Sequence, residues 1–156
     1  ALPAGRFEWR AEGWFNPVVL DLSASPAQAV YLLYFLGDDG LSVAARIQND
    51  RGTLRPGLVA KNPDGGFPSD DGPGVIAVGE WRRWRLELLR VARRETTAVL
   101  SLDEGGGRLK EQARLNWDSS VHEPLRLRAG IGFSSVGAAA TVLADELWLT
   151  ESTLSE

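Results

Sequence analysis

A segment in the middle of the chain, residues 79–90 (GEWRRWRLELLR), constrains the fold more than any other part of the sequence. Hydrophobic and charged positions alternate along it, with Trp84, Leu86 and Leu88 on one side and Arg85 and Glu87 on the other. Successive side chains of a β-strand point to opposite faces, so this period of two predicts a strand with one buried and one solvated face. We therefore expect Trp84 to be buried between two layers of the fold.

Further segments repeat this alternation and predict more strands: 6–12, 41–48, 96–102, 125–133 and 143–150. Residues 29–36 (AVYLLYFL) are hydrophobic throughout, which predicts a central strand or one covered on both faces. Short strands are expected at 18–22, 58–60 and 112–117, and the Pro- and Gly-rich residues 61–74 predict a long loop. No segment shows the period of an amphipathic helix. Roughly ten strands at hairpin spacing predict one all-β domain over residues 1–156, a two-sheet antiparallel jelly-roll sandwich.

The composition excludes several classes of protein. The chain has no cysteine, so disulfides and thiolate metal sites are excluded. Its net charge of −4 and its pI near 5.1 argue against nucleic-acid binding. No hydrophobic run approaches the roughly 18–20 residues of a membrane span. The chain begins ALPAG, without an initiator methionine, which is typical of a processed secreted chain or an excised domain, so we expect a secreted or cell-surface location.

Three motifs follow one another in the second half of the chain: GEWRRWRLEL (79–88), EPLRLRAGIGFSS (123–135) and ADELWLTESTLSE (144–156). In this order they resemble the G-x-W-x-x-V-x-L, P-L-x-I-G and closing I-D-E-V-R-I-Y strands of concanavalin A-like lectin/glucanase domains, which include laminin-G-like modules. Trp84 stands in the place of the valine. The resemblance implies a jelly roll of one convex and one concave sheet. It also implies that the protein binds glycans, proteins or calcium, or hydrolyses β-glucans.

Hydrolysis is not expected from the residues present. The glucanases of this family carry an E-x-D-x-x-E strand motif, which supplies the two carboxylates that a retaining glycosidase needs. No such triplet occurs here, and His122, the single histidine, lies in a predicted turn before Pro124. We therefore expect a protein that is not an enzyme and does not hydrolyse β-glucans.

A ligand-binding surface is predicted from exposed aromatic and arginine side chains. Trp148 alternates with Leu147 and Leu149, so we expect it on the outer face of its strand, and Phe67 lies in the predicted loop 61–74. Flat aromatic side chains stack on sugar rings or fill a pocket of a protein partner. The predicted binding residues are Trp148, Phe67, Arg126 and Arg128. The alternative is that the aromatic residues seal a sheet edge.

Asp145 is the carboxylate with the least expected position. Its parity matches Leu143 and Leu147, so the pattern predicts that it faces the core, where an unpaired charge is costly. Backbone N–H groups or an arginine would satisfy it, and a calcium ion is the alternative. The Asp-rich turns 38–40, 64–65 and 70–72 could also offer oxygen ligands for calcium, although Asp-Gly is equally ordinary turn chemistry. No cofactor is expected, with calcium as the one candidate.

These observations predict a non-catalytic, extracellular, lectin-like or adhesion module that binds a glycan or a protein surface. One alternative is a structural or assembly module of a surface protein or filament without a small-molecule ligand. A further alternative is a glycan hydrolase with an unrecognised site. The ligand and the oligomeric state stay open at this point.

Overall fold

The chain folds into two antiparallel sheets. A computed structural model describes residues 9–37, 40–90, 95–118, 126–131, 135 and 137–151, and it contains no helix within these ranges. The ten strands are β1 (Trp9–Asp21), β2 (Ala29–Gly37), β3 (Gly40–Asp50), β4 (Thr53–Ala60), β5 (Ser69–Asp71), β6 (Arg82–Arg90), β7 (Glu95–Asp103), β8 (Leu109–Asp118), β9 (Arg126–Ala129) and β10 (Ala139–Glu151). Sheet I has the order β10-β1-β6-β7-β8 and sheet II the order β5-β4-β3-β2-β9. The predicted all-β, two-sheet jelly roll is confirmed.

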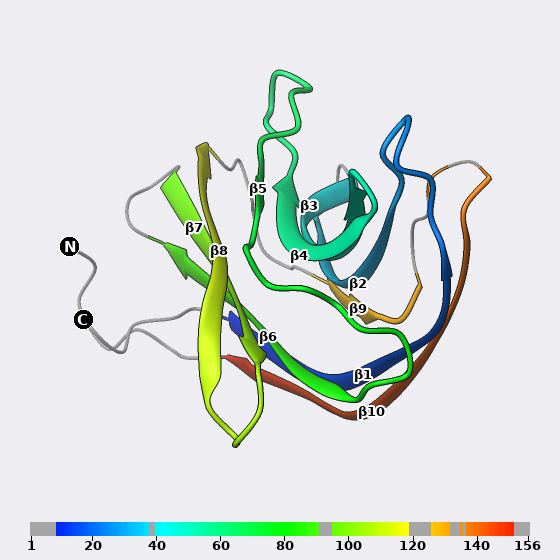
Figure 1. Ribbon diagram of the computed structural model, residues 1–156. Helices are drawn as coiled ribbons and strands as arrows, with labels where there is room; N and C mark the ends of the chain where they lie inside the picture. The colour runs from blue at the N-terminus through cyan, green and yellow to red at the C-terminus, as the bar shows by residue number, and fades with distance from the viewer. Residues whose placement is uncertain are drawn as a thin grey trace.

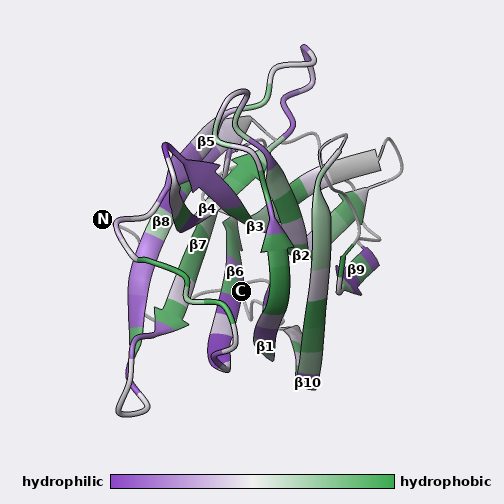
Figure 2. Cartoon of the chain, turned by 45° about the vertical axis from the view of Figure 1, so that its right-hand side comes forward, coloured by the Kyte–Doolittle hydropathy of each residue, from purple (hydrophilic) through white to green (hydrophobic). Residues whose placement is uncertain are grey.

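The two sheets are bent in the same sense, and sheet II lies on the concave side of sheet I (Figure 1). The outer face of sheet II is therefore itself concave. Between the sheets lies one hydrophobic core, to which β1, β2, β3, β6 and β7 contribute most of the buried side chains. Figure 2 shows hydrophobic segments along these strands, whereas β8 and the loop between β4 and β5 are mostly hydrophilic.

Trp84 is the largest side chain that is fully buried in this core, with 1% of its surface exposed. Its indole packs edge-on against Phe15 of β1, with ring centroids 6.4 Å apart and an interplanar angle of 84°. It also lies opposite Leu102 in the β6–β7 pair. The expected burial of Trp84 between two layers is confirmed.

Two strands are longer than the sequence pattern predicts. β1 runs without a break from Trp9 to Asp21, because a register shift after Pro17 accommodates the proline within the strand. β4 extends over eight residues although it contains Pro56 and Gly57, and β5 lies inside the predicted loop 61–74. The expected break in β1 and the expected three-residue strand at 58–60 were wrong, because proline and glycine are tolerated where pairing is irregular or one-sided.

A β-bulge in β10 changes which face its residues occupy. Glu12 pairs with Trp148 and Trp14 pairs with Asp145, so Gly13 opposes two residues of β10. Glu146, one of these two, has a left-handed φ of 49°. Glycine fits at position 13 because a Cβ there would lie 2.5 Å from Leu147 Cδ2, closer than atoms normally approach. The bulge places Asp145 on the outer face with Trp14, and the expectation that Asp145 faces the core was wrong.

Ion pairs cross the outer face of sheet I. Arg10 Nη2 lies 2.6 Å from Glu87 Oε1, and Arg85 Nε lies 2.6 Å from Glu12 Oε1. Glu12 also pairs with Arg83 through its second oxygen. Burial alone would raise the pKa of Glu12, but the hydrogen bonds from Arg83 and Arg85 outweigh it and lower the pKa below its ordinary value of 4.5.

We expect Glu12→Gln to lower the free energy of unfolding by about 1–3 kcal/mol at neutral pH, because it leaves two guanidinium groups without their carboxylate. A carboxyl whose pKa is lowered by folding contributes stability above its unfolded pKa and loses it as the pH falls through the folded pKa. The difference between Glu12→Gln and wild type should therefore shrink below about pH 4.5. Urea unfolding at several pH values measures it, with Glu111→Gln in an exposed pair as the control. A difference that does not change with pH would contradict the assignment.

Candidate functional site

The concave outer face of sheet II carries a group of polar and aromatic side chains on adjacent strands. Opposed residues of paired strands share a face, and Val59, Ala44, Tyr34 and Arg128 form one row across β4, β3, β2 and β9. The neighbouring row holds Gly57, Arg46 and Tyr31, and Gln48 follows one row further on β3. We call the surface formed by these side chains the concave face: Tyr31, Tyr34, Arg46, Gln48, Arg126 and Arg128.

The floor of the concave face is shielded from solvent although it lies outside the core. Tyr34 is 5% exposed, and it forms a second hydrophobic cluster with the buried Ala44 and Val59. Tyr31 and Leu36 pack against this cluster. Sheet II is curved, and this face lies on its concave side (Figure 1). The result is a concave surface with a low local dielectric, in which polar interactions are stronger than in water.

Several buried polar atoms of β3 have no hydrogen-bond partner in the described part of the chain. They are Arg46 Nε, Gln48 Oε1 and Ser42 Oγ. Ser42 lies at the register shift between β2 and β3. Nearly all buried polar groups of folded proteins are paired, and leaving one unpaired costs about 1–3 kcal/mol. Two of these groups, on Arg46 and Gln48, belong to alternate residues of one strand and therefore share a face. Water or a ligand is the partner that such groups take.

Arg46 is held in place from two strands away. Its Nη2 lies 3.0 Å from Asp71 Oδ1 on β5, and the side chain of Arg46 is largely buried. Gly57 of β4 lies between the two residues, and a Cβ at this position would overlap Asp71 Oδ1. The missing side chain of Gly57 thus lets Asp71 reach Arg46. The contact of Nη2 with Asp71 fixes the orientation of the guanidinium group of Arg46. The Nε–H group of the same side chain has no hydrogen-bond partner among the described residues.

The concave face is basic in a chain with a net charge of −4. Arg46, Arg126 and Arg128 supply three positive charges, and Asp71 supplies one negative charge. Arginine presents planar N–H donors that match a carboxylate in a bidentate manner. The side chains of Arg126 and Arg128 are exposed on the edge strand β9. The arrangement therefore suits an acidic ligand.

The structure places the four predicted binding residues in three different parts of the fold. Arg126 and Arg128 lie on the concave face, and Phe67, 60% exposed, lies in the loop between β4 and β5. Backbone bonds fix the base of that loop, since Lys61 N donates to Ser42 O. Trp148 is 66% exposed on the outer face of sheet I, opposite Glu12. It therefore belongs to a different surface from the two arginines. His122 lies outside the described residues.

Other residues of the concave face were not predicted from the sequence. Alternation alone assigns four of them to the outer face of their strands, where they would be either solvated or covered: Tyr31, Tyr34, Arg46 and Gln48. One signal was present: residues 29–36 are hydrophobic on both sides, and two tyrosines occur among them. A strand whose outer face is also shielded was therefore expected, but not the polar partners that β3 places beside it.

Asp145 shows no sign of a metal-binding role. Its Oδ1 accepts a hydrogen bond of 2.8 Å from the N–H of Glu146 at the bulge, and the side chain is exposed. Among the residues described, no three His, Asp or Glu side chains gather in a way that would hold a metal ion. A backbone N–H group therefore satisfies this carboxylate, which is the kind of partner expected, although on the opposite face.

We expect Asp145→Ala to cost about 1 kcal/mol, because it removes one hydrogen bond that supports the left-handed residue Glu146. Thermal melts of wild type and variant should be unchanged by EDTA. A melting temperature of the wild type that falls on chelation would instead indicate a bound cation, since a ligand specific for the folded state stabilises it.

Comparison with known proteins gives matches at the level of structure only. No protein family matches the chain, and no curated protein matches it in sequence. An alginate lyase from Klebsiella pneumoniae superposes with a TM-score of 0.67 at 12% identity over 94% of this chain and 61% of the enzyme. A polysaccharide lyase of family 18, aly-SJ02, gives 0.56 at 9% identity over 93% of this chain and 72% of that enzyme. A family 7 alginate lyase in complex with substrate gives 0.50 at 14% identity over 97% of this chain and 63% of that enzyme.

These similarities place the chain among jelly-roll β-sandwiches, and it spans less than two thirds of the length of the Klebsiella pneumoniae enzyme. They also correct the expectation of a non-catalytic module. The matched structures are all named as polysaccharide-cleaving enzymes, so the interpretation of this chain as a binding or structural module without catalysis was wrong. That interpretation came from the absence of paired carboxylates, which argues only against hydrolysis by the retaining mechanism. In the described ranges, no helix is long and hydrophobic enough to cross a membrane.

Proposed function

We propose that this chain belongs to a polysaccharide lyase that cleaves uronate-containing glycans such as alginate, and that the concave face of sheet II binds the substrate. The observation that carries the proposal is the pair of buried, unpartnered polar groups on Arg46 and Gln48, on the face of sheet II that also carries Tyr34 and Arg128. The fold similarity to alginate lyases supports the same choice. We also propose that the jelly roll is of the concanavalin A-like type, which the motifs of the second half resemble.

A lyase breaks a glycosidic bond by elimination, so it needs no pair of carboxylates. A base removes the proton from the sugar carbon next to the carboxylate, the adjacent C–O bond to the neighbouring sugar breaks, and the electron pair forms a carbon–carbon double bond. The departing oxygen takes up a proton. Negative charge accumulates on the uronate carboxylate as the proton leaves, and cationic donors that are already in place stabilise it.

Residues of the concave face match these tasks. Arg128 and the Nε–H group of Arg46 are the cationic donors for the uronate carboxylate. Tyr34, directly opposite Arg128, is the proton-transfer group: its phenolate oxygen takes the proton from the sugar carbon, and the resulting phenol returns a proton to the departing oxygen. The carbonyl of Gln48 accepts a hydrogen bond from a sugar hydroxyl. The basic charge of this face attracts a polyanion and excludes cationic glycans.

The proposal is tested by incubating the protein with alginate and recording the ultraviolet absorbance of the unsaturated uronate at the new chain end. We expect the absorbance to rise while the polymer shortens. Laminarin, a neutral β-glucan, should give neither signal and serves as the control substrate. Reducing ends that form without unsaturation would indicate hydrolysis and overturn the proposal, as would alginate that keeps its size.

A further inference from the structure

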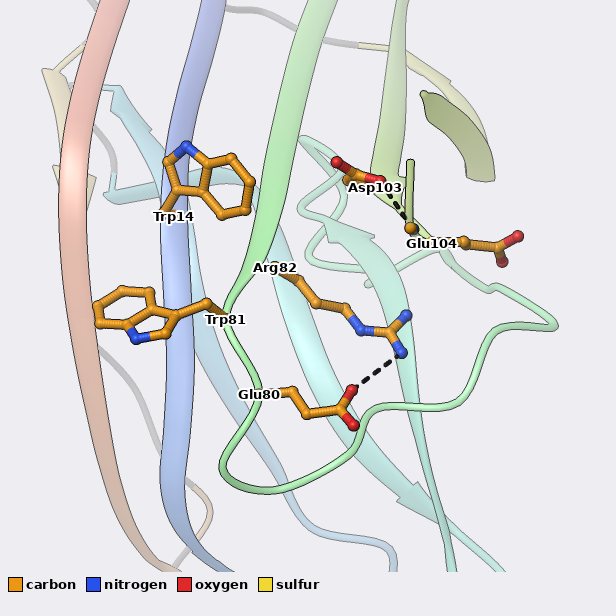
Figure 3. Close-up of a pocket in the computed structure, with 7 residues that line it drawn as sticks. Trp14, Glu80, Trp81, Arg82, Asp103 and Glu104 are labelled. Atoms are coloured by element: carbon orange, nitrogen blue, oxygen red, sulfur yellow. Dashed lines mark hydrogen bonds and ion pairs between the residues drawn. The ribbon is translucent and has the colours of Figure 1, made fainter. Parts of the chain in front are cut away.

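A pocket lies at sheet I, whereas the concave face belongs to sheet II. The pocket has a volume of about 230 Å³ and lies where β6 begins and β7 ends. The side chains around it belong to Trp14, Glu80, Trp81, Arg82, Asp103 and Glu104, with Gly105 completing the wall (Figure 3). We call it the tryptophan pocket. It is smaller than the roughly 300–1,000 Å³ of pockets for drug-sized ligands, so it suits a single small unit.

One side of the tryptophan pocket is aromatic. Trp14 projects from the outer face of β1, and Trp81 lies just before β6 on the same side of the pocket (Figure 3). Trp81 is 45% exposed. Neither indole belongs to the hydrophobic core. Two tryptophans that line a pocket and do not pack in the core offer flat surfaces to a ligand.

The other side of the tryptophan pocket is acidic. Glu80, Asp103 and Glu104 line it together with Arg82, whose Nη2 lies 3.5 Å from Glu80 Oε2. Asp103 is the most buried of the three, with 9% of its surface exposed. A hydrogen bond from Gln112, and a weaker contribution from Lys110, lower the pKa of Glu104. Arg82 pairs with Glu80 and Lys110 pairs with Glu104, so the three carboxylates leave one net negative charge here, in contrast to the basic concave face.

Backbone and side-chain bonds hold the walls of the pocket in place. Gly79 N donates to Pro17 O at 2.8 Å, which ties the segment before Trp81 to β1. Asp103 Oδ1 accepts from Gly105 N at 2.7 Å, and Gly105 has a φ of 116°, which favours glycine. Gln112 Nε2 donates to Glu104 Oε1 at 2.9 Å. A ligand therefore binds without first ordering these groups, which reduces the cost of binding.

We propose that the tryptophan pocket binds one hexose unit that lacks a carboxylate, either neutral or amine-bearing. The C–H face of a pyranose ring stacks on Trp81, and its hydroxyl or ammonium hydrogens are donated to Asp103 and Glu80. A uronate is disfavoured, because its carboxylate would lie close to the carboxylates of Glu80 and Asp103. This site is independent of the proposed lyase activity, and it would let the protein contact a second, non-acidic glycan.

The test uses the full chain and three probes: a glucose tetramer, a glucosamine tetramer and a guluronate tetramer. Calorimetric titration should give binding of at least one of the first two, and weaker or no binding of the guluronate tetramer at this site. Trp81→Ala should weaken the bound neutral or amino sugar at least 10-fold, whereas Trp81→Phe should keep most of the affinity. Val75→Ala, which removes an exposed hydrophobic side chain that does not line the pocket, is the control and should change nothing.

Asp103→Asn separates the two ligand classes, because asparagine keeps the oxygen that accepts from Gly105 N but removes the charge. It should weaken the glucosamine tetramer more than the glucose tetramer. Thermal melts establish that each variant is folded. The proposal is overturned if neither the glucose nor the glucosamine tetramer binds, or if folded Trp81→Ala binds them as the wild type does. It is also overturned if the guluronate tetramer competes for the same pocket. Each of these results leaves the lyase assay on alginate unaffected.

Discussion

Trp84→Ala is expected to lower the free energy of unfolding by about 3–5 kcal/mol. The indole is almost completely buried between the sheets, contacts Phe15 edge-on and lies opposite both Gly13 of β1 and Leu102 of β7. Alanine would leave a cavity that three packed strands cannot fill without distorting their pairing. The aromatic contact with Phe15 adds to the loss, because edge-to-face pairs contribute about 0.5–1.5 kcal/mol beyond burial.

For a domain of this size the loss corresponds to a melting temperature lower by roughly 6–20 °C, at about 2–4 °C per kcal/mol. Urea unfolding and calorimetry measure both quantities. Trp148→Ala is the matched control, because it removes an exposed tryptophan and should change stability by less than about 0.5 kcal/mol. A Trp84→Ala protein as stable as wild type would show that this indole does not support the packing of the two sheets.

The layer structure was predictable because it follows from side-chain alternation. Trp84, Leu86 and Leu88 share a face, and so do Val43, Ala45 and Ile47 of β3, and all six are buried. Burying one face of a strand is the dominant favourable contribution to the free energy of folding, so a period of two in hydrophobicity fixes which side faces inward. The all-hydrophobic residues 29–36 likewise predicted that β2 is an interior strand, and it lies between β3 and β9.

Irregular pairing was not predictable from the same pattern. Strict alternation places Asp145 with Leu147, but the extra residue at the bulge opposite Gly13 moves it to the other face. In β2 a register shift lets Leu32 and Leu33, which are adjacent, both enter the core. A bulge depends on the partner strand, which the local sequence does not specify.

The candidate site escaped prediction for a related reason. Arg46 and Gln48 alternate with buried residues of β3, and the ordinary interpretation of such positions is a solvated face. In the folded protein, however, the side chain of Arg46 is largely buried, and so is Tyr34 on the neighbouring strand. The contact between Arg46 and Asp71 joins residues 25 positions apart across Gly57. Such a contact depends on strand order, which alternation does not contain. Arg126 and Arg128 were identifiable because polarity alone marked them.

Arg128→Ala and Tyr34→Phe are expected to reduce the rate of alginate cleavage by about 100-fold or more each. Loss of a positioned donor to developing negative charge costs about 10²–10³ in rate. Loss of a proton-transfer group costs about 10²–10⁴. Phenylalanine keeps the ring of Tyr34 in the cluster with Ala44 and Val59, so the variant retains its packing and loses only the hydroxyl. The initial rate of unsaturated uronate formation at saturating alginate is the measurement.

The two variants should differ in how they lose activity. Arg128→Ala removes a charge that binds the uronate carboxylate before and during reaction, so KM should rise and kcat should fall. Tyr34→Phe removes a group that acts on the reacting atoms, so kcat should fall with little change in KM. Arg114→Ala is the matched control, because it removes an exposed arginine of sheet I that pairs only locally with Glu111. If Tyr34→Phe is folded and as active as wild type, Tyr34 does not transfer the proton. If Arg128→Ala lowers the rate no more than Arg114→Ala does, the substrate carboxylate does not lie on the concave face.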